Sequence, residues 1–325
     1  MLYREALNLA LDEELKQDKN LVLLGEDIGA FGGTFRVTEG LFAKYGKNRV
    51  IDTPIAELSI VGNAIGMAIA GLRPVVELMT ANFSLLAFDQ IINHMSKIPY
   101  MSAGKIRLPM VIRMPQGVSR QLGAQHSESY EQMLSAVPGV FVFAVADPTY
   151  AYHALRQSIR MDDPVIFIEH ELLYNKNSEV DVNAKVNPFK ARLVKEGDDI
   201  TIISYLKMLD DTLTCIDEIE KSLNCSCEVI DLCSLNPIDF QSLEVSISKT
   251  GRVVLVEEGH KMGSFGAQVI SWAAEELFYL LDAPPLRLSG ENVPIAYNRQ
   301  LELASIPTPQ SITKDIIQWG KQSGL

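Results

Sequence analysis

Short, almost wholly apolar runs recur along the first part of this 325-residue chain, and segments with helical periodicity separate them. Apolar runs of this length are typical of strands in a parallel sheet that is covered on both faces. Strands that alternate with helices favour a doubly wound, mostly parallel sheet, because each parallel connection needs a crossover. The sequence therefore predicts an α/β fold. We expect strands at residues 21–25, 73–79, 108–113, 139–145 and 164–169.

A polar stretch without periodicity, residues 176–190, interrupts this alternation. Such stretches are typical of linkers, and 325 residues are enough for two domains of ordinary size. A second, shorter pattern of strands and helices begins at Asp199. We therefore predict a first domain over 1–176, a linker over 177–194 and a smaller α/β domain over 195–325.

The composition limits the kinds of partner. Apolar residues make up 47% of the chain, charged residues 22%, and the formal net charge is -12. An acidic chain is a poor ligand for nucleic acid or an anionic membrane, so we expect neither partner. No apolar run is long enough to cross a bilayer. The N-terminus reads directly into an amphipathic helix and lacks the apolar core of a signal peptide.

The cysteines indicate a reducing compartment. They do not have zinc-ligand spacing, and no histidine lies near the Cys-Ser-Cys pattern. We expect reduced, partly buried thiols. This favours a bacterial cytoplasm, or the mitochondrial matrix or plastid after removal of a transit peptide. The four cysteines are Cys215, Cys225, Cys227 and Cys233.

The stretch 52–57, Asp-Thr-Pro-Ile-Ala-Glu, leads into a predicted helix over 58–71. Glycines at Gly62 and Gly66 share one helix face, where another backbone can approach closely. Glu57 stands at the loop-to-helix transition, where little else is charged. A partly desolvated carboxyl group there would share a proton with a ligand nitrogen. The alternative is that Glu57 only complements the N-terminus of the helix.

Glu57, Phe83 and His126 all follow predicted strands, where open α/β sheets bind their ligands. A carboxyl group, an aromatic face and an imidazole could together hold a planar heteroaromatic ligand and face its substrate. His126 lies in a long polar loop, residues 115–129, and loops of this length are usually functional. The alternatives are core packing for Phe83 and a surface position for His126.

A metal and diphosphate site is missing from the pattern. The chain has no GDG followed by an asparagine some two dozen residues later, and no cluster of aspartates and histidines. The glycine-rich loop over 26–34 lacks the lysine of a P-loop. We therefore expect no metal ligands in this chain. If the ligand is a phosphorylated cofactor, another chain must hold its phosphates.

These features together resemble the beta subunits of the thiamine-diphosphate-dependent 2-oxo acid dehydrogenases, in their decarboxylating component. The resemblance covers nearly the whole chain. It implies a transketolase-like pyrimidine-binding domain followed by a transketolase C-terminal domain, in an α2β2 heterotetramer. The motifs that carry it include Gly25-Glu26-Asp27, Asp52-Thr53-Pro54-Ile55-Ala56-Glu57, Gly71-Leu72-Arg73-Pro74, Phe88-Asp89-Gln90-Ile91, Gln125-His126-Ser127, Val137-Pro138-Gly139 and Gly259-His260.

The resemblance also implies roles for individual residues. Glu57 matches the glutamate that bonds N1' of the aminopyrimidine of thiamine diphosphate, and Phe83 matches the aromatic residue that stacks on that ring. His126 matches the histidine that orients substrate and serves transfer to a lipoyl group. Glu26 and Met79 match positions near the cofactor. By the same resemblance the alpha subunit holds most of the Mg2+ site, and a monovalent cation is a possible further ligand.

The substrate that the resemblance implies is pyruvate, from the segments 77–83, 124–127 and 171–174. A branched-chain 2-oxo acid or acetoin is the alternative within the family. Glu128 and Met133 depart from the usual glutamine and aromatic residue. The implied partners are the alpha subunit, a dihydrolipoyl acyltransferase core and its lipoyl domain. A subunit without catalysis that only bridges others, or a stand-alone thiamine enzyme, are alternatives of other kinds.

Overall fold

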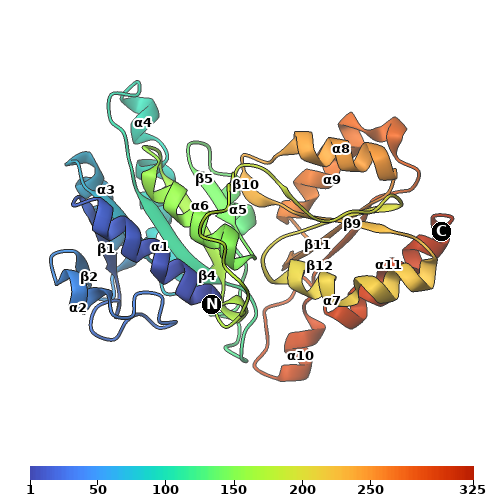
Figure 1. Cartoon of the computed structure of the whole chain (residues 1–325), viewed down its shortest axis with the longest axis horizontal. Helices are drawn as coiled ribbons and strands as arrows, with labels where there is room; N and C mark the ends of the chain where they lie inside the picture. Colours follow the sequence, from blue (N-terminus) through green and yellow to red (C-terminus); the bar gives the residue numbers. More distant parts are fainter. The chain divides into compact units, whose positions relative to one another are not determined.

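The computed structural model describes residues 1–325, and the chain divides into two compact units. Unit 1 comprises Met1–Gln116 and Met133–Pro188, and unit 2 comprises Gly117–Gln132 and Phe189–Leu325. Each unit contains a sheet with helices beside it (Figure 1). The predicted first domain counts residues 117–132 as its own, whereas their packing groups them with unit 2. The predicted domain limits stay a prediction.

The sheet of unit 1 is parallel, with the strand order β5-β6-β4-β3-β1-β2. Every residue of β1, β4 and β6 is buried, as expected for strands covered on both faces. The predicted α/β fold is thus confirmed. The strands are β1 (Leu21–Gly25), β2 (Val50–Asp52), β3 (Arg73–Glu77), β4 (Val111–Gln116), β5 (Phe141–Ala144) and β6 (Val165–His170).

Helices connect these strands. α1 and α6 pack together, and Glu14 of α1 lies 2.7 Å from the guanidinium of Arg156 on α6. The α-helices of this part are α1 (Tyr3–Gln17), α2 (Leu41–Tyr45), α3 (Glu57–Ile69), α4 (Ile98–Met101), α5 (Glu131–Ser135) and α6 (Pro148–Arg160). It also contains the 3-10 helices η1 (Ala81–Ala87) and η3 (Glu171–Leu173) and the π-helix η2 (Gln90–Met95).

α3 has one buried and one open face. A side chain at Gly62 would meet only the end of the Gln90 side chain, at 3.3 Å, and one at Gly66 would meet nothing within 4 Å. The close backbone approach that the glycine spacing predicts is therefore not made by this chain. The buried face consists of Ile60, Val61, Ala64, Ile65 and Ala68.

Unit 2 has a mixed sheet with the order β12-β11-β8-β9-β7, in which only β7 runs antiparallel to its neighbour. The strands of this sheet are β7 (Arg192–Lys195), β8 (Ile200–Ser204), β9 (Cys227–Asp231), β11 (Val253–His260) and β12 (Leu286–Gly290), and unit 2 also contains β10 (Cys233–Asn236), which is not part of it. Its helices are α7 (Leu206–Leu223), α8 (Phe240–Thr250), α9 (Phe265–Glu276), η4 (Phe278–Leu280), α10 (Arg299–Ala304) and α11 (Pro309–Gln322).

The four cysteines are free, and three of them are buried. Burial raises the pKa of the Cys215, Cys225 and Cys227 thiols, which keeps them in the less reactive thiol form. None of the helices combines the length and the apolar composition that a membrane span requires.

Candidate active site

The carboxyl ends of the parallel strands in unit 1 bring several predicted site residues to one sheet edge. Glu26 directly follows β1, Glu57 follows β2 after a short loop, and Met79 follows β3. Because β1 pairs with both β2 and β3, these three segments are neighbours at that edge. Open α/β sheets bind their ligands at this edge.

Glu57 is the first residue of α3, and only 4% of its surface is exposed. The residue before it, Ala56, provides no side-chain cap for the helix. A carboxylate at this position is stabilised by the partial positive charge of the helix N-terminus. No hydrogen bond or ion pair holds the Glu57 carboxyl group, so it has capacity to bond a ligand.

Glu26 provides a second buried carboxyl group at the same edge. Burial and the neighbouring carboxyl group of Glu57 raise the pKa of Glu26. The Oγ1 atom of Thr53, in the loop between β2 and α3, is buried and has no hydrogen-bond partner. Buried polar groups without partners are rare and indicate a site that is completed by something else. Thr53 lies in the loop that leads to Glu57.

The loop after β1 is tied to the loop after β2. The backbone N–H of Gly29 donates a hydrogen bond to Oδ1 of Asp52 at 2.6 Å. A Cβ atom at Gly29 would lie 2.2 Å from Oδ2 of Asp52, so only glycine fits there. This contact holds the segment after Glu26 against the segment that leads to Glu57.

Met79 and Phe83 follow β3, and both are half-buried. Leu78 is fixed by a hydrogen bond from its N–H to the carbonyl of Arg113 at 2.9 Å, which anchors the start of this segment on β4. Phe83 lies in η1 and is not part of the fully buried core. It therefore retains an exposed portion on which a planar ring could stack.

His126 belongs to unit 2 and is exposed. Its backbone N–H donates to the carbonyl of Gly123 at 3.2 Å, so the segment forms a tight turn. Unit 1 therefore groups Glu26, Glu57, Met79 and Phe83, and it does not include His126.

A buried ion cluster in unit 1 was not predicted from the sequence. The guanidinium of Arg113 on β4 lies 2.7 Å from Glu77 of β3 and 2.7 Å from Glu169 of β6. Tyr174 donates a hydrogen bond to Glu169 at 2.6 Å. A signal for this cluster was present, because each of the three charged residues interrupts an apolar run. Their positions on neighbouring strands follow only from the strand order.

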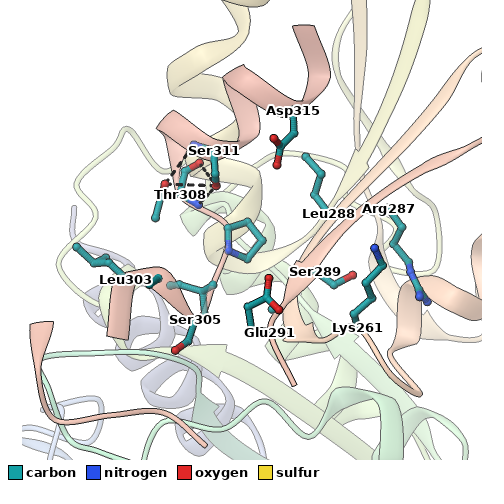
Figure 2. A pocket seen from close by; sticks show the side chains of 14 residues that line it. Lys261, Arg287, Leu288, Ser289, Glu291, Leu303, Ser305, Thr308, Ser311 and Asp315 are labelled. Carbon is teal, nitrogen blue, oxygen red and sulfur yellow. Dashed lines mark hydrogen bonds between the residues drawn. The ribbon is translucent and has the colours of Figure 1, made fainter. Parts of the chain in front are cut away.

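Unit 2 contains a cavity of about 390 Å³ beside β12, α10 and the start of α11. Figure 2 shows Lys261 and Arg287 on one side of it and the hydrogen-bonded pair Thr308 and Ser311 on the other. None of the predicted site residues lines this cavity. No group of three or more histidine, cysteine, aspartate or glutamate side chains in the chain is arranged to hold a metal ion.

Comparisons with known proteins match both parts of the chain to domain families. Residues 1–177 match the family model of the transketolase pyrimidine binding domain, and residues 189–312 match the transketolase C-terminal domain. A solved chain described as a split gene transketolase, inactive beta4 tetramer, superposes with a TM-score of 0.81 over 99% of this chain and 98% of its own. Its sequence identity of 23% limits that likeness to the fold.

Curated relatives match over nearly the full length. The pyruvate dehydrogenase E1 component subunit beta of Gracilaria tenuistipitata var. liui is 44% identical over 97% of this chain and 98% of its own. The mitochondrial pyruvate dehydrogenase E1 component subunit beta-2 of Oryza sativa subsp. japonica is 41% identical over 97% of this chain and 85% of its own. This chain therefore belongs to the transketolase-like family that includes the beta subunits of the pyruvate dehydrogenase E1 component.

Proposed function

We propose that this chain is the beta subunit of a pyruvate dehydrogenase E1 component. Together with an alpha subunit it catalyses the thiamine-diphosphate-dependent oxidative decarboxylation of pyruvate and transfers the acetyl group to a lipoyl domain. The names of relatives that are 39% to 44% identical support pyruvate over a branched-chain 2-oxo acid or acetoin. The observation that carries the proposal is the buried carboxyl pair of Glu57 and Glu26, which has no cationic partner.

The residues at the sheet edge fit the aminopyrimidine part of thiamine diphosphate. Glu57 is buried and unbonded, which suits a ring nitrogen that shares a proton with it. Phe83 would stack on the ring, and Met79 would lie against it. We assign the Mg2+ and the diphosphate mainly to the alpha subunit, because this sequence has no GDG motif followed by an asparagine. A monovalent cation remains part of this proposal.

When bound, the cofactor supplies an electron sink for the loss of carbon dioxide. The side chains of this chain orient it and control one proton. Glu57 holds that proton against the ring nitrogen. Burial and the Glu57 carboxyl group raise the pKa of the neighbouring Glu26, which favours its neutral form. His126 orients the substrate and serves acetyl transfer to the lipoyl domain.

The open face of α3 supports an assembly with another chain. Leu58 is 51% exposed and Ile69 is 49% exposed, and Gly66 between them leaves room for close approach. Ile55, just before the helix, is 82% exposed. Large apolar side chains grouped on one face are typical of an interaction site. We assign this face to the alpha subunit or a second beta subunit, and docking to the acyltransferase core remains a further proposal.

The substitution Glu57→Gln tests the function. An amide cannot relay the proton, so we expect pyruvate-dependent dye reduction by the assembled α2β2 enzyme to fall by about 10² or more. Glu39→Gln makes the same change of charge at an exposed position of unit 1 and is the matched control. Near-normal turnover by the Glu57→Gln enzyme, with its assembly intact, would contradict the proposal.

A second measurement separates the substrates. The wild-type enzyme is assayed with pyruvate, a branched-chain 2-oxo acid and acetoin under the same conditions. We expect pyruvate to give the highest kcat/KM. If the enzyme preferred either of the other substrates, the role proposed for Glu57 would stand, but pyruvate would be wrong as the substrate.

A further inference from the structure

The segment that carries His126, residues 117–132, is held to the rest of unit 2 by carboxyl groups. The N–H of Val118 donates to Glu258 of β11, and the N–H of Gln121 donates to Glu302 of α10 at 2.9 Å. Tyr205 donates to Glu131, at the end of the segment, at 2.9 Å. These three contacts fix the two ends of the segment. A fourth contact lies next to His126 itself.

That fourth contact joins Glu128, two residues after His126, to His260 at the end of β11. Oε2 of Glu128 lies 3.4 Å from Nε2 of His260, and the two side chains are 22% and 24% exposed. A cavity of only about 10 Å³ adjoins them, lined also by Ser127 and Glu258. The pair is thus largely enclosed, and such pairs are screened less than surface pairs.

The hydrogen bond made by Nδ1, the other ring nitrogen of His260, determines where the hydrogen of the neutral ring lies. Nδ1 of His260 lies 2.6 Å from the carbonyl oxygen of Glu291. A carbonyl oxygen only accepts hydrogen bonds, so Nδ1 carries a hydrogen. In a neutral ring, Nε2 then carries no hydrogen, and its lone pair faces the carboxyl group of Glu128. The contact becomes a hydrogen bond only when a second proton is present, on His260 or on Glu128.

Most charges around His260 are negative. Glu258 precedes it on β11 and is 8% exposed, and a Cβ atom at Gly259 would lie 3.0 Å from Oε1 of Glu131. Glu291 is exposed and contacts the ring through its backbone, and the adjacent Lys261 is exposed too. Negative charge on the buried carboxyl groups therefore surrounds the ring, and the exposed ammonium of Lys261 offsets it weakly.

We propose that Glu128 and His260 form a proton-dependent latch that positions the His126 segment. Both are positioning residues, because neither is assigned a contact with substrate. With the proton present, an ion pair holds the segment two residues from His126. When the pH rises and the proton leaves, a lone pair faces a carboxylate and the latch opens. The effect on turnover rests on the role proposed for His126, whereas the latch itself does not.

Hydrogen exchange of the backbone amides of residues 117–132 tests the latch in the assembled α2β2 enzyme. Rates are measured at pH 6 and pH 8 and corrected for the intrinsic pH dependence of exchange. We expect about tenfold less protection at pH 8 in the wild type, from loss of one charge-assisted hydrogen bond. Glu128→Gln should abolish this difference. Glu276→Gln, which makes the same charge change at an exposed site of unit 2, should keep it.

A second variant guards against general loosening of the segment. Glutamine at position 260, in His260→Gln, offers an amide N–H to Glu128 at every pH. We expect protection that no longer depends on pH but stays closer to the pH 6 value of the wild type. Equal pH dependence in the wild type and in Glu128→Gln, or none in the wild type, would overturn the latch.

Turnover then tests positioning. We expect kcat/KM for pyruvate to change between pH 6 and pH 8 by a severalfold smaller factor in His260→Gln than in the wild type. An unchanged pH profile together with altered exchange would overturn the positioning role. Absence of any pyruvate turnover in the wild type would contradict the proposed function, while the exchange data would still decide the latch.

Discussion

Two pairs of glutamates lie at or near the carboxyl ends of the parallel strands of unit 1, and they differ in one respect. Glu77 and Glu169 flank Arg113, whose guanidinium lies 2.7 Å from each of them. Glu26 and Glu57 have no cation beside them and form no ion pair. Both pairs are at or near the carboxyl ends of parallel strands. This end of the sheet thus has one compensated and one uncompensated pair.

The difference indicates which pair serves structure and which serves chemistry. A buried carboxylate costs free energy unless hydrogen bonds or an opposite charge compensate it. Burial lowers the pKa of Arg113, but the carboxylates of Glu169 and Glu77 raise it by more, so the guanidinium stays charged. Burial raises the pKa of Glu169, and Arg113 opposes that rise. The second pair keeps an unfavourable interaction in the folded chain. Uncompensated groups of this kind cluster at functional sites, where a ligand relieves the cost.

Removing the cation from the compensated pair should give the largest change. In Arg113→Met both carboxyl groups lose their cation, and Glu169 keeps only the hydrogen bond from Tyr174, so we expect the free energy of unfolding to fall by about 3–5 kcal/mol. Denaturant unfolding monitored by circular dichroism measures it. Arg107→Met is the control, because Arg107 is exposed and lies 3.7 Å from the exposed Asp163. A loss below 1 kcal/mol would mean that Glu77 and Glu169 do not depend on Arg113.

A smaller change should follow from the hydroxyl group that completes the same cluster. Tyr174 donates to Glu169 at 2.6 Å, and its ring stacks on Phe35 with the ring centroids 4.8 Å apart. Tyr174→Phe keeps the stacking and removes the hydrogen bond. We expect a loss of about 1.5–3 kcal/mol, the range for hydrogen bonds to charged groups. Tyr100→Phe, at a side chain that is 89% exposed, should change the stability little. Equal stability of the two variants would contradict a role for the Tyr174 hydroxyl group.

The fold was largely predictable because apolar runs report burial. The predicted strand 21–25 coincides with β1, and the predicted strands 73–79 and 164–169 overlap β3 and β6. The short strands β10 and β12 were not predicted. The segment after β3 contains the 3-10 helix η1 and the π-helix η2. Apolar periodicity does not define which carbonyl each N–H bonds, so it cannot separate these helix types.

The candidate site was predictable only in part. Glu57 stood out because it is a lone charge at a helix start, and the structure buries it there. Local sequence patterns did not place Glu26 beside it, because Glu26 is 31 residues away and becomes adjacent only through the pairing of β1 with β2. The anchors of the His126 segment were hidden for the same reason. Glu258 and Glu302 lie far along the chain and contact the segment through tertiary packing.

The smallest change should have the opposite sign and should come from the uncompensated pair. Burial and the Glu57 carboxyl group raise the pKa of Glu26. Between the ordinary pKa of a glutamate and this raised value, the folded state binds more protons than the unfolded state. Stability then falls as the pH rises through that interval. Glu26→Gln removes this loss, so we expect its Tm in the absence of cofactor to exceed that of the wild type at pH 7, by on the order of 1 °C.

The pH dependence of that difference is the sharper test. The Tm of Glu26→Gln and of the wild type should converge below the ordinary pKa of glutamate, where Glu26 is protonated in both states. Glu77→Gln provides the contrast, because it removes a carboxylate from Arg113 and should lower the Tm at pH 7. Opposite signs for the two glutamates would separate a carboxyl group kept for a ligand from one kept for the fold. The same sign for both would mean that the presence of Arg113 beside one pair does not distinguish the two pairs.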